Sequence, residues 1–334
     1  MGKASLAPAM SARQSNVAVE VDRGAPVPES GMGGEQLVFS RAGSIWTMRT
    51  DGGDLEQLTT RSLDGPDLSP SLSPKGDAVL YSSLRDGVYC LFVLPFDDLI
   101  PRQLTDGGRA TSGPASSSPP GDFQASWSPE GHRVVFARGQ PAESLSLYVM
   151  DVPPDNGSLG VASQLFAADD DAPEYVGHPV FTPDGTSILF SADRREGKGT
   201  AIFSLDLSTR SLRRVTPIAP RPRSVIDLDP ALSPDGSTLV FASNRHRPQQ
   251  VGDLDLFSVS LDGSGLTRLT DDPGSAREPA FSPDGRRVYF SSTRVHRGTS
   301  AWEVHVMAAG GGKARRMTRD ERPQNRAPSV ARAQ

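Results

Sequence analysis

Three residues whose side chains could bind a metal or exchange a proton recur at one point of a repeated pattern. His178, Asp229 and Glu278 each stand directly before a proline, and they lie about fifty residues apart. An imidazole and two carboxylates brought together could hold a divalent cation or orient a polar or cationic ligand. The alternative is that polar side chains simply line a wet channel. The sequence leaves both interpretations open.

The repeat extends this set to six equivalent positions. Each stands just before the innermost strand of its repeat, so we predict that the six ring a central channel. In chain order they are Ser69, Gln124, His178, Asp229, Glu278 and Ala327. Ser69, Gln124, His178, Asp229 and Glu278 are therefore the first candidate residues for binding a ligand or partner.

A second repeated feature is an arginine at the end of the second strand of each repeat. The six are Arg41, Arg85, Arg138, Arg194, Arg245 and Arg294. We expect them on the same face as the channel mouth, where they could attract an anionic partner. Arg245 and Arg294 accordingly join the candidate binding residues. The alternative, favoured by their presence in every repeat, is that each arginine pairs with a carboxylate and fixes adjacent loops. The carboxylates considered are Asp106, Asp271, Asp229 and Glu278.

The elements that must position these residues are short strands joined by tight turns. The pattern Ser/Thr-Pro-x-Gly begins at residues 73, 128, 182, 233 and 282. Proline presets φ at the second turn position and glycine accepts the exit geometry, so each copy predicts a hairpin turn. An apolar run ending on an aromatic residue follows every turn, as in Leu239-Val240-Phe241, and Leu37-Val38-Phe39 is a sixth copy without a turn. Such runs are typical of strands covered on both faces.

Two further strands complete each repeat, so the sequence predicts an all-β, six-bladed β-propeller with four antiparallel strands per blade. The third strand carries an aromatic residue in five repeats and His305 in the last, so we expect His305 to pack in the core. The first repeat begins at Leu37 without an innermost strand, whereas the C-terminal segment from Ala327 to Val330 looks like one. We therefore predict that this segment completes the first blade and closes the ring.

These turns, aromatic-terminated strands and Leu-Thr strands together resemble the repeats of TolB-type β-propellers over about residues 34–332. The resemblance implies a binding function in a bacterial cell envelope, periplasmic or envelope-associated. A cytoplasmic location stays open because the first residues lack a hydrophobic signal core. TolB proteins carry an α/β domain before the propeller, whereas residues 1–33 here are rich in Ala, Pro, Ser and Gly and are expected to form a disordered tail.

Composition and missing motifs narrow the function further. The formal net charge of −5 argues against a nucleic-acid partner, and no apolar stretch reaches the roughly 18 residues of a membrane span. Cys90 is the single cysteine, and no hydrolase or zinc-protease motif is present. Our leading hypothesis is a monomeric, non-catalytic module that binds a protein or peptide, without a cofactor unless the channel holds a divalent cation. The alternative is a metal-assisted carbohydrate-active lyase or hydrolase that uses His178, Asp229 and Glu278.

Overall fold

The computed structural model of the 334-residue chain describes residues 34–108, 119–140, 144–154, 158–166, 175–193, 199–219, 225–248, 253–271, 274–294, 301–319 and 324–332. Within these ranges every helix-or-strand element is a β-strand. The expected disordered tail, residues 1–33, lies outside the described residues, as does Arg194.

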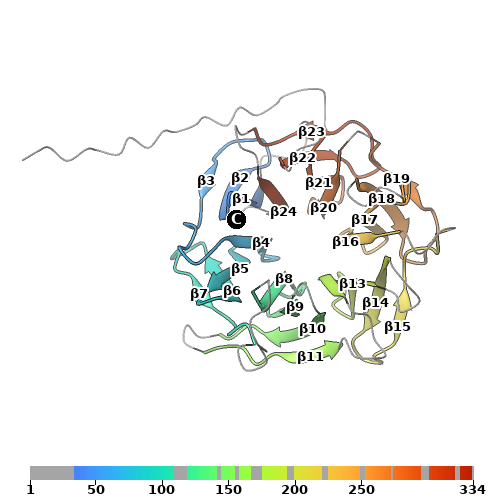
Figure 1. Ribbon diagram of the computed structural model, residues 1–334. Coiled ribbons are helices and arrows are strands. Elements are labelled where there is room, and N and C mark those ends of the chain that lie inside the picture. Colours follow the sequence, from blue (N-terminus) through green and yellow to red (C-terminus); the bar gives the residue numbers. More distant parts are fainter. Residues whose placement is uncertain are drawn as a thin grey trace, which may run out of the picture.

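The strands radiate from a central axis in groups of four, which we call blades and name by their innermost strand (Figure 1). The β24 blade contains β24 (Asn325–Arg332), β1 (Glu35–Arg41), β2 (Ser44–Arg49) and β3 (Glu56–Gln57). The β4 blade contains β4 (Asp67–Leu72), β5 (Ala78–Arg85), β6 (Val88–Pro95) and β7 (Arg102–Gln103). The β8 blade contains β8 (Gly121–Trp127), β9 (Arg133–Gln140), β10 (Ser144–Asp151) and β11 (Ser163–Phe166).

The other half of the ring is built in the same way. The β12 blade contains β12 (Val176–Phe181), β13 (Ser187–Asp193), β14 (Thr200–Asp206) and β15 (Leu212–Arg214). The β16 blade contains β16 (Asp227–Leu232), β17 (Thr238–Ser243), β18 (Asp255–Ser260) and β19 (Thr267–Arg268). The β20 blade contains β20 (Ala276–Phe281), β21 (Arg287–Ser292), β22 (Glu303–Ala308) and β23 (Arg315–Arg316).

Neighbouring strands within each blade run antiparallel, so the all-β propeller fold predicted from the sequence is confirmed. The β4 and β8 blades share one eight-stranded sheet, because β6 and β8 make a parallel contact at Tyr89 and Gly121. The β4 and β8 blades are therefore named separately on either side of this contact.

The first blade is closed by the C-terminal strand, as predicted. β24 runs antiparallel to β1, with Leu37 opposite Val330 and Arg41 opposite Asn325. An ion pair links this blade to the β20 blade. Arg287 of β21 donates from Nη2 to both carboxylate oxygens of Glu35 in β1, each at 3.0 Å. Both side chains are buried. This closure pairs the inner edge of β1.

Each predicted hairpin turn is held by its own side chains, as the turn after β16 illustrates. The N–H of Gly236 donates to the Ser233 carbonyl at 2.8 Å, and Gly236 has φ 74°, which glycine adopts without steric cost. The Ser233 hydroxyl accepts from the N–H of Thr238 at 2.9 Å and donates to Asp235 at 2.5 Å. The turn thereby fixes the register of the two innermost strands.

The core lies between the blades and is built on the aromatic residues that end the apolar runs. Each of these aromatic side chains is at most 1% exposed: Phe39, Tyr81, Phe136, Phe190, Phe241 and Phe290. Burying one aromatic side chain removes about 150–250 Å² from water. His305 stacks on Phe290 with ring centroids 5.7 Å apart and is 1% exposed, so the prediction that it packs in the core is confirmed.

Candidate binding site at the mouth of the central channel

One residue of every innermost strand has its backbone in the left-handed region, with φ between 51° and 55°. Positive φ is uncommon outside glycine, yet here it recurs at a β-bulge in all the blades described. All of these residues line one central cavity of about 360 Å³. We call them the collar: Ser69, Gln124, His178, Asp229, Glu278 and Ala327. The structure thus brings together the residues that the repeat aligned.

His178 is tied to the collar residues on both sides. Its Nε2 lies 2.9 Å from Oδ1 of Asp229 and 2.8 Å from Nε2 of Gln124. Its backbone N–H donates to Oε1 of Gln124 at 2.9 Å, and Nδ1 lies 3.2 Å from the Tyr175 hydroxyl. A protonated Nε2 can donate to Asp229, which only accepts, whereas an unprotonated Nε2 can accept from the Gln124 amide nitrogen, which only donates, so each tautomer satisfies one of these two contacts. The imidazole is therefore already engaged on both nitrogens.

The two collar carboxylates each bind an arginine and a backbone N–H of the next blade. Arg277 donates from Nε to Oδ2 of Asp229 at 2.9 Å and from Nη2 to Oδ1 at 3.1 Å, and the N–H of Glu278 donates to Oδ2 at 3.1 Å. In the following blade Arg326 donates to Glu278 Oε1 at 2.7 Å, and the N–H of Ala327 donates to Oε2 at 2.8 Å. The same arrangement thus occurs twice in succession.

Charge pairing decides the ionisation of the buried acid. Burial alone would raise the pKa of Asp229, but Arg277 and then His178 outweigh burial and hold this pKa well below the usual value. Burial raises the pKa of the neighbouring Tyr175, and the Asp229 carboxylate raises it further. Asp229 is therefore an anion and Tyr175 a neutral phenol at neutral pH. Such a pair suits fixed hydrogen bonding better than proton exchange.

A larger cavity of about 770 Å³ opens at the collar on the channel mouth. Four collar candidates line it, Ser69, Gln124, His178 and Glu278, whereas Asp229 lines only the central cavity below. Two guanidinium groups, those of Arg277 and Arg326, reach the same wall. Small and apolar residues also line this cavity: Ala42, Gly43, Pro66 and Leu68. The mouth thus combines ion-paired polar groups with apolar surface.

The arginines that end the second strands lie elsewhere. Arg245 and Arg294 line neither cavity among the described residues. Arg245 is 8% exposed and pairs with Asp227, Nη2 to Oδ2 at 2.5 Å. The guanidinium of Arg294 lies 5.5 Å from the centre of the Phe290 ring. The Arg245 contact supports the pairing interpretation for that residue. Its carboxylate, Asp227, stands two residues before the collar residue Asp229 and was not among those the sequence analysis considered.

Three residues of the site were missed by the sequence analysis: Tyr175, Arg277 and Arg326. The two arginines stand directly before collar residues, but the repeat gave no signal because other blades carry Leu68, Phe123 or Leu228 at that position. A basic residue directly before a collar position, following a blade with an acidic collar residue, is the signal that could have found the two arginines. Tyr175 lies three residues before His178, outside the aligned position.

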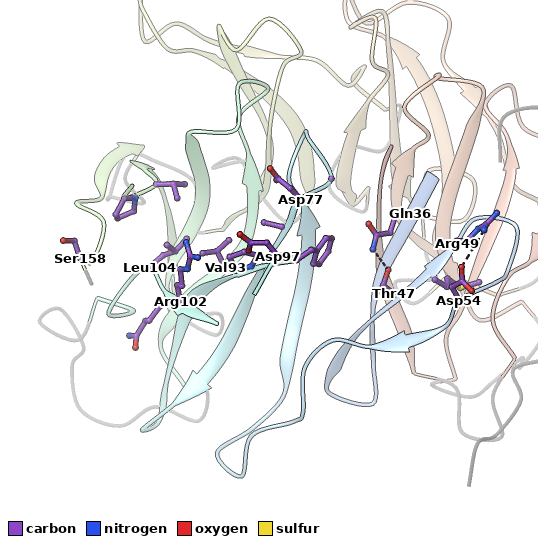
Figure 2. A pocket seen from close by; sticks show the side chains of 18 residues that line it. Gln36, Thr47, Arg49, Asp54, Asp77, Val93, Asp97, Arg102, Leu104 and Ser158 are labelled. Carbon is purple, nitrogen blue, oxygen red and sulfur yellow. Dashed lines mark hydrogen bonds and ion pairs between the residues drawn. The ribbon is translucent and has the colours of Figure 1, made fainter. Parts of the chain in front are cut away.

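Another cavity, of about 780 Å³, lies beside the turn at Gly76 and Asp77 and is shown in Figure 2. Its polar lining is largely self-paired: Gln36 donates to the Thr47 hydroxyl at 3.0 Å, and Arg49 lies 3.7 Å from Asp54. No collar residue lines this cavity within the described part of the chain.

Within the described residues no group of three or more His, Cys, Asp or Glu side chains is arranged to hold a metal ion. No helix in the same ranges is long and apolar enough to cross a membrane.

Part of the chain matches a known protein family, and the fold resembles solved structures. Residues 223–333 match the family model described as the TolB beta propeller domain. An uncharacterized protein of Agrobacterium fabrum is 31% identical over 158 residues, covering 45% of this chain and 50% of that relative. Dipeptidyl-peptidase 5 of Porphyromonas gingivalis is 43% identical over 63 residues, or 19% of this chain and 9% of that protein. The chain thus spans half or less of these relatives. The crystal structure of TolB from Acinetobacter baumannii superposes with a TM-score of 0.67 at 19% identity, covering 90% of this chain and 67% of that one.

Proposed function

We propose that this chain, a TolB-like β-propeller, is a non-catalytic binding module whose channel-mouth face docks a protein or peptide. The resemblance to TolB propellers also leads us to place it in a bacterial cell envelope, acting as a monomer without a cofactor. The observation that carries the proposal is the state of the collar. Its polar groups are already bonded to one another, while a cavity of about 770 Å³ stands open above them.

The paired collar suits recognition because its geometry is fixed before a partner arrives. His178 contacts Gln124, Tyr175 and Asp229, and Asp229 contacts Arg277. A preorganised polar surface loses little side-chain entropy on binding, and the arginines at the rim would orient an approaching chain. The apolar residues that line the mouth offer surface that a partner side chain could bury.

The carbohydrate-active alternative receives no support from these contacts. It requires His178, Asp229 and Glu278 to act on a substrate or ligate a metal. In the structure Asp229 binds Arg277, Glu278 binds Arg326, and both nitrogens of His178 lie within hydrogen-bond distance of neighbours. Freeing these groups would leave two guanidinium groups without their carboxylates.

The test compares two matched substitutions on opposite sides of the ring. Ile226 lines the mouth cavity, whereas Ile100 is 61% exposed in the loop between β6 and β7. Affinity capture from a lysate of the source organism, with identification by mass spectrometry, would use wild type, Ile226→Glu and Ile100→Glu. We expect a specific protein retained by wild type and Ile100→Glu but lost by Ile226→Glu. Equal retention by all three would show that the mouth is not the docking site.

A further inference from the structure

The cavity beside the turn at Gly76 lies at the end of the blades away from the mouth. β4 passes the collar at Ser69 and then reaches this turn, and no described residue lines both this cavity and the mouth cavity. We call this cavity the turn-side groove. A ligand bound in it would leave the collar accessible, so a site here is separate from the proposed function.

The turn-side groove is elongated and crosses three blades (Figure 2). Gln36 and Thr47 of the β24 blade lie at one end, and Asp97 lies near the middle. Arg102 and Leu104 lie at the other end, where the loop between β10 and β11 of the β8 blade also contributes to the lining. An elongated site of about 780 Å³ suits a short extended segment of chain.

The floor of the groove is partly apolar, and exposed apolar side chains stand at its edge. Val93 and Leu104 line the floor and are already buried in the core between blades. Leu99, Ile100 and Leu159 stand next to lining residues, in the loops between β6 and β7 and between β10 and β11, and each is at least half exposed. Apolar side chains gathered beside a groove are typical of a contact surface. They offer area that a bound segment would remove from water.

Hydrogen bonds fix the two loops that carry these side chains. Asp98 accepts from the N–H of Ile100 at 2.9 Å and from Arg102 Nη2 at 3.0 Å. The N–H of Gly160 donates to the carbonyl of Leu104 at 2.8 Å, which ties the loop of the β8 blade to the β4 blade. The edge of the groove is therefore ordered before a ligand arrives, and binding loses little loop entropy.

The lining of the groove carries more acid than base. Arg49 Nη2 lies 2.6 Å from Asp51. Arg102 Nη2 lies 3.0 Å from Asp98. Both guanidinium groups are thus paired with carboxylates outside the lining, while the lining itself contains three further carboxylates: Asp54, Asp77 and Asp97. Together with the formal net charge of −5, this excess of acid favours a cationic ligand.

Asp97 is the lining acid best placed to meet such a ligand. It is exposed, and its carboxylate makes no hydrogen bond or ion pair within the part of the chain that the structure describes. A guanidinium or ammonium group that reached it would form a charge-assisted hydrogen bond. The half-buried Phe96 beside it could contact the aliphatic stem of the same basic side chain.

We propose that the turn-side groove is a second docking site, which binds an extended segment of another protein that combines apolar and basic side chains. The apolar side chains cover the exposed edge of the groove, and a basic side chain pairs with Asp97. Residues 17–22 of this chain also alternate apolar and charged residues, but the charges are Glu20 and Asp22, which the acidic lining would repel.

Three acetylated, amidated pentapeptides test the chemistry of the ligand. Val-Arg-Val-Arg-Val is apolar and basic, Ser-Arg-Ser-Arg-Ser is only basic, and Val-Glu-Val-Glu-Val is apolar and acidic. Titration of the ¹⁵N-labelled full chain, followed through the amide resonances of Val93 and Asp97, reports binding in the groove. We expect saturable shifts with the first peptide and at least ten-fold weaker binding of the other two. No shift with the first peptide, or equal binding of the acidic one, would overturn the proposal.

Matched variants with the melting temperature of wild type test the location. Asp97→Asn and Ile100→Gln should each weaken binding of the first peptide about three- to five-fold, as expected for one exposed ion pair or one exposed apolar contact. Asp262→Asn makes the same change of charge in an exposed loop of the β16 blade and should bind as wild type does. Ile226→Glu, at the mouth, should also bind normally, which separates this site from the proposed function. Unchanged binding by Asp97→Asn and Ile100→Gln would refute docking in the groove.

Discussion

Replacing Asp229 with asparagine would remove one negative charge from the centre of the collar while keeping its shape. The carboxylate now accepts two hydrogen bonds from Arg277 and one from the N–H of Glu278, and it lies 2.9 Å from His178 Nε2. An asparagine can still accept from the Glu278 N–H, but it leaves the Arg277 guanidinium without its counter-ion. The substitution therefore keeps the size of the side chain while it removes the charge and one of the two acceptor oxygens.

The size of the effect follows from burial. Removing one partner of a buried ion pair costs about 3–5 kcal/mol. Asp229 is 3% exposed at its side chain, but Arg277 is 24% exposed and His178 is 19% exposed, so water can solvate the stranded charges in part. We therefore expect the lower end, about 3 kcal/mol. At about 2–4 °C per kcal/mol, this loss lowers the melting temperature by about 6–12 °C.

The pH dependence provides the sharper assay, read by thermal unfolding followed with circular dichroism. The pKa of Asp229 is held well below its usual value, chiefly by Arg277 once burial has been overcome. A carboxyl with a depressed folded pKa contributes stability above its unfolded pKa of about 3.9 and loses it as the pH falls through the folded pKa. The gap between wild type and Asp229→Asn should be full from about pH 5 to 8 and should close in strong acid.

A second substitution serves as the control for the loss of an aspartate in general. Asp262 is exposed in the loop after β18, where it accepts from Ser264. Asp262→Asn should leave the melting temperature close to that of wild type at neutral pH. If Asp229→Asn melted within 1 °C of wild type, on the scale where about 1 kcal/mol moves the midpoint by 2–4 °C, the collar charge network would not be stabilising. A gap that persisted unchanged at pH 2 would also contradict the assigned ionisation.

Three further changes test how the ring is built, each by thermal unfolding. Glu35→Ala should lower the free energy of unfolding by about 3 kcal/mol or more, because it leaves buried Arg287 without its carboxylate. Adding Arg287→Met should restore most of that stability. If stability were not restored, the loss would not come from the ion pair. Deletion from residue 325 onward removes β24 and should lower the midpoint by several degrees, and an unchanged midpoint would refute closure of the ring by this strand. Gly236→Ala places a side chain at φ 74° and should cost about 1–2 kcal/mol, whereas a neutral result would mean that the turn relaxes.

The propeller could be predicted from the sequence because its determinants are local and repeated. A turn such as Ser233-Pro234-Asp235-Gly236 is fixed by side chains within five residues of one another, and the aromatic residue at Phe241 follows at a constant distance. The collar positions followed by alignment, since every blade places the same backbone bulge there. Their positive φ could not be foreseen, because Ser, Gln, Glu and Ala do not favour it.

The partners of the collar could not be predicted, because they lie in neighbouring blades. Arg277 and Arg326 each bind a carboxylate almost a full repeat earlier in the chain, |i−j| being 48 in both cases. These pairs also break the symmetry of the repeat, which was the only long-range signal available. The partner of Arg245 was missed for a different reason. Asp227 lies within the same blade as Arg245, but the sequence contains several acidic residues that could have paired with this arginine.

The closure of the first blade has a consequence for how the protein reaches its folded state. β1 and β24 are hydrogen-bonded neighbours, although almost the entire described chain separates them. During synthesis the inner edge of β1 therefore stays unpaired until β24 has left the ribosome. An unpaired strand edge can pair with other chains and lead to aggregation. A circular permutant that begins between two blades would contain only contiguous blades and would shorten this exposed interval. Its yield of soluble protein at high expression should exceed that of the natural order.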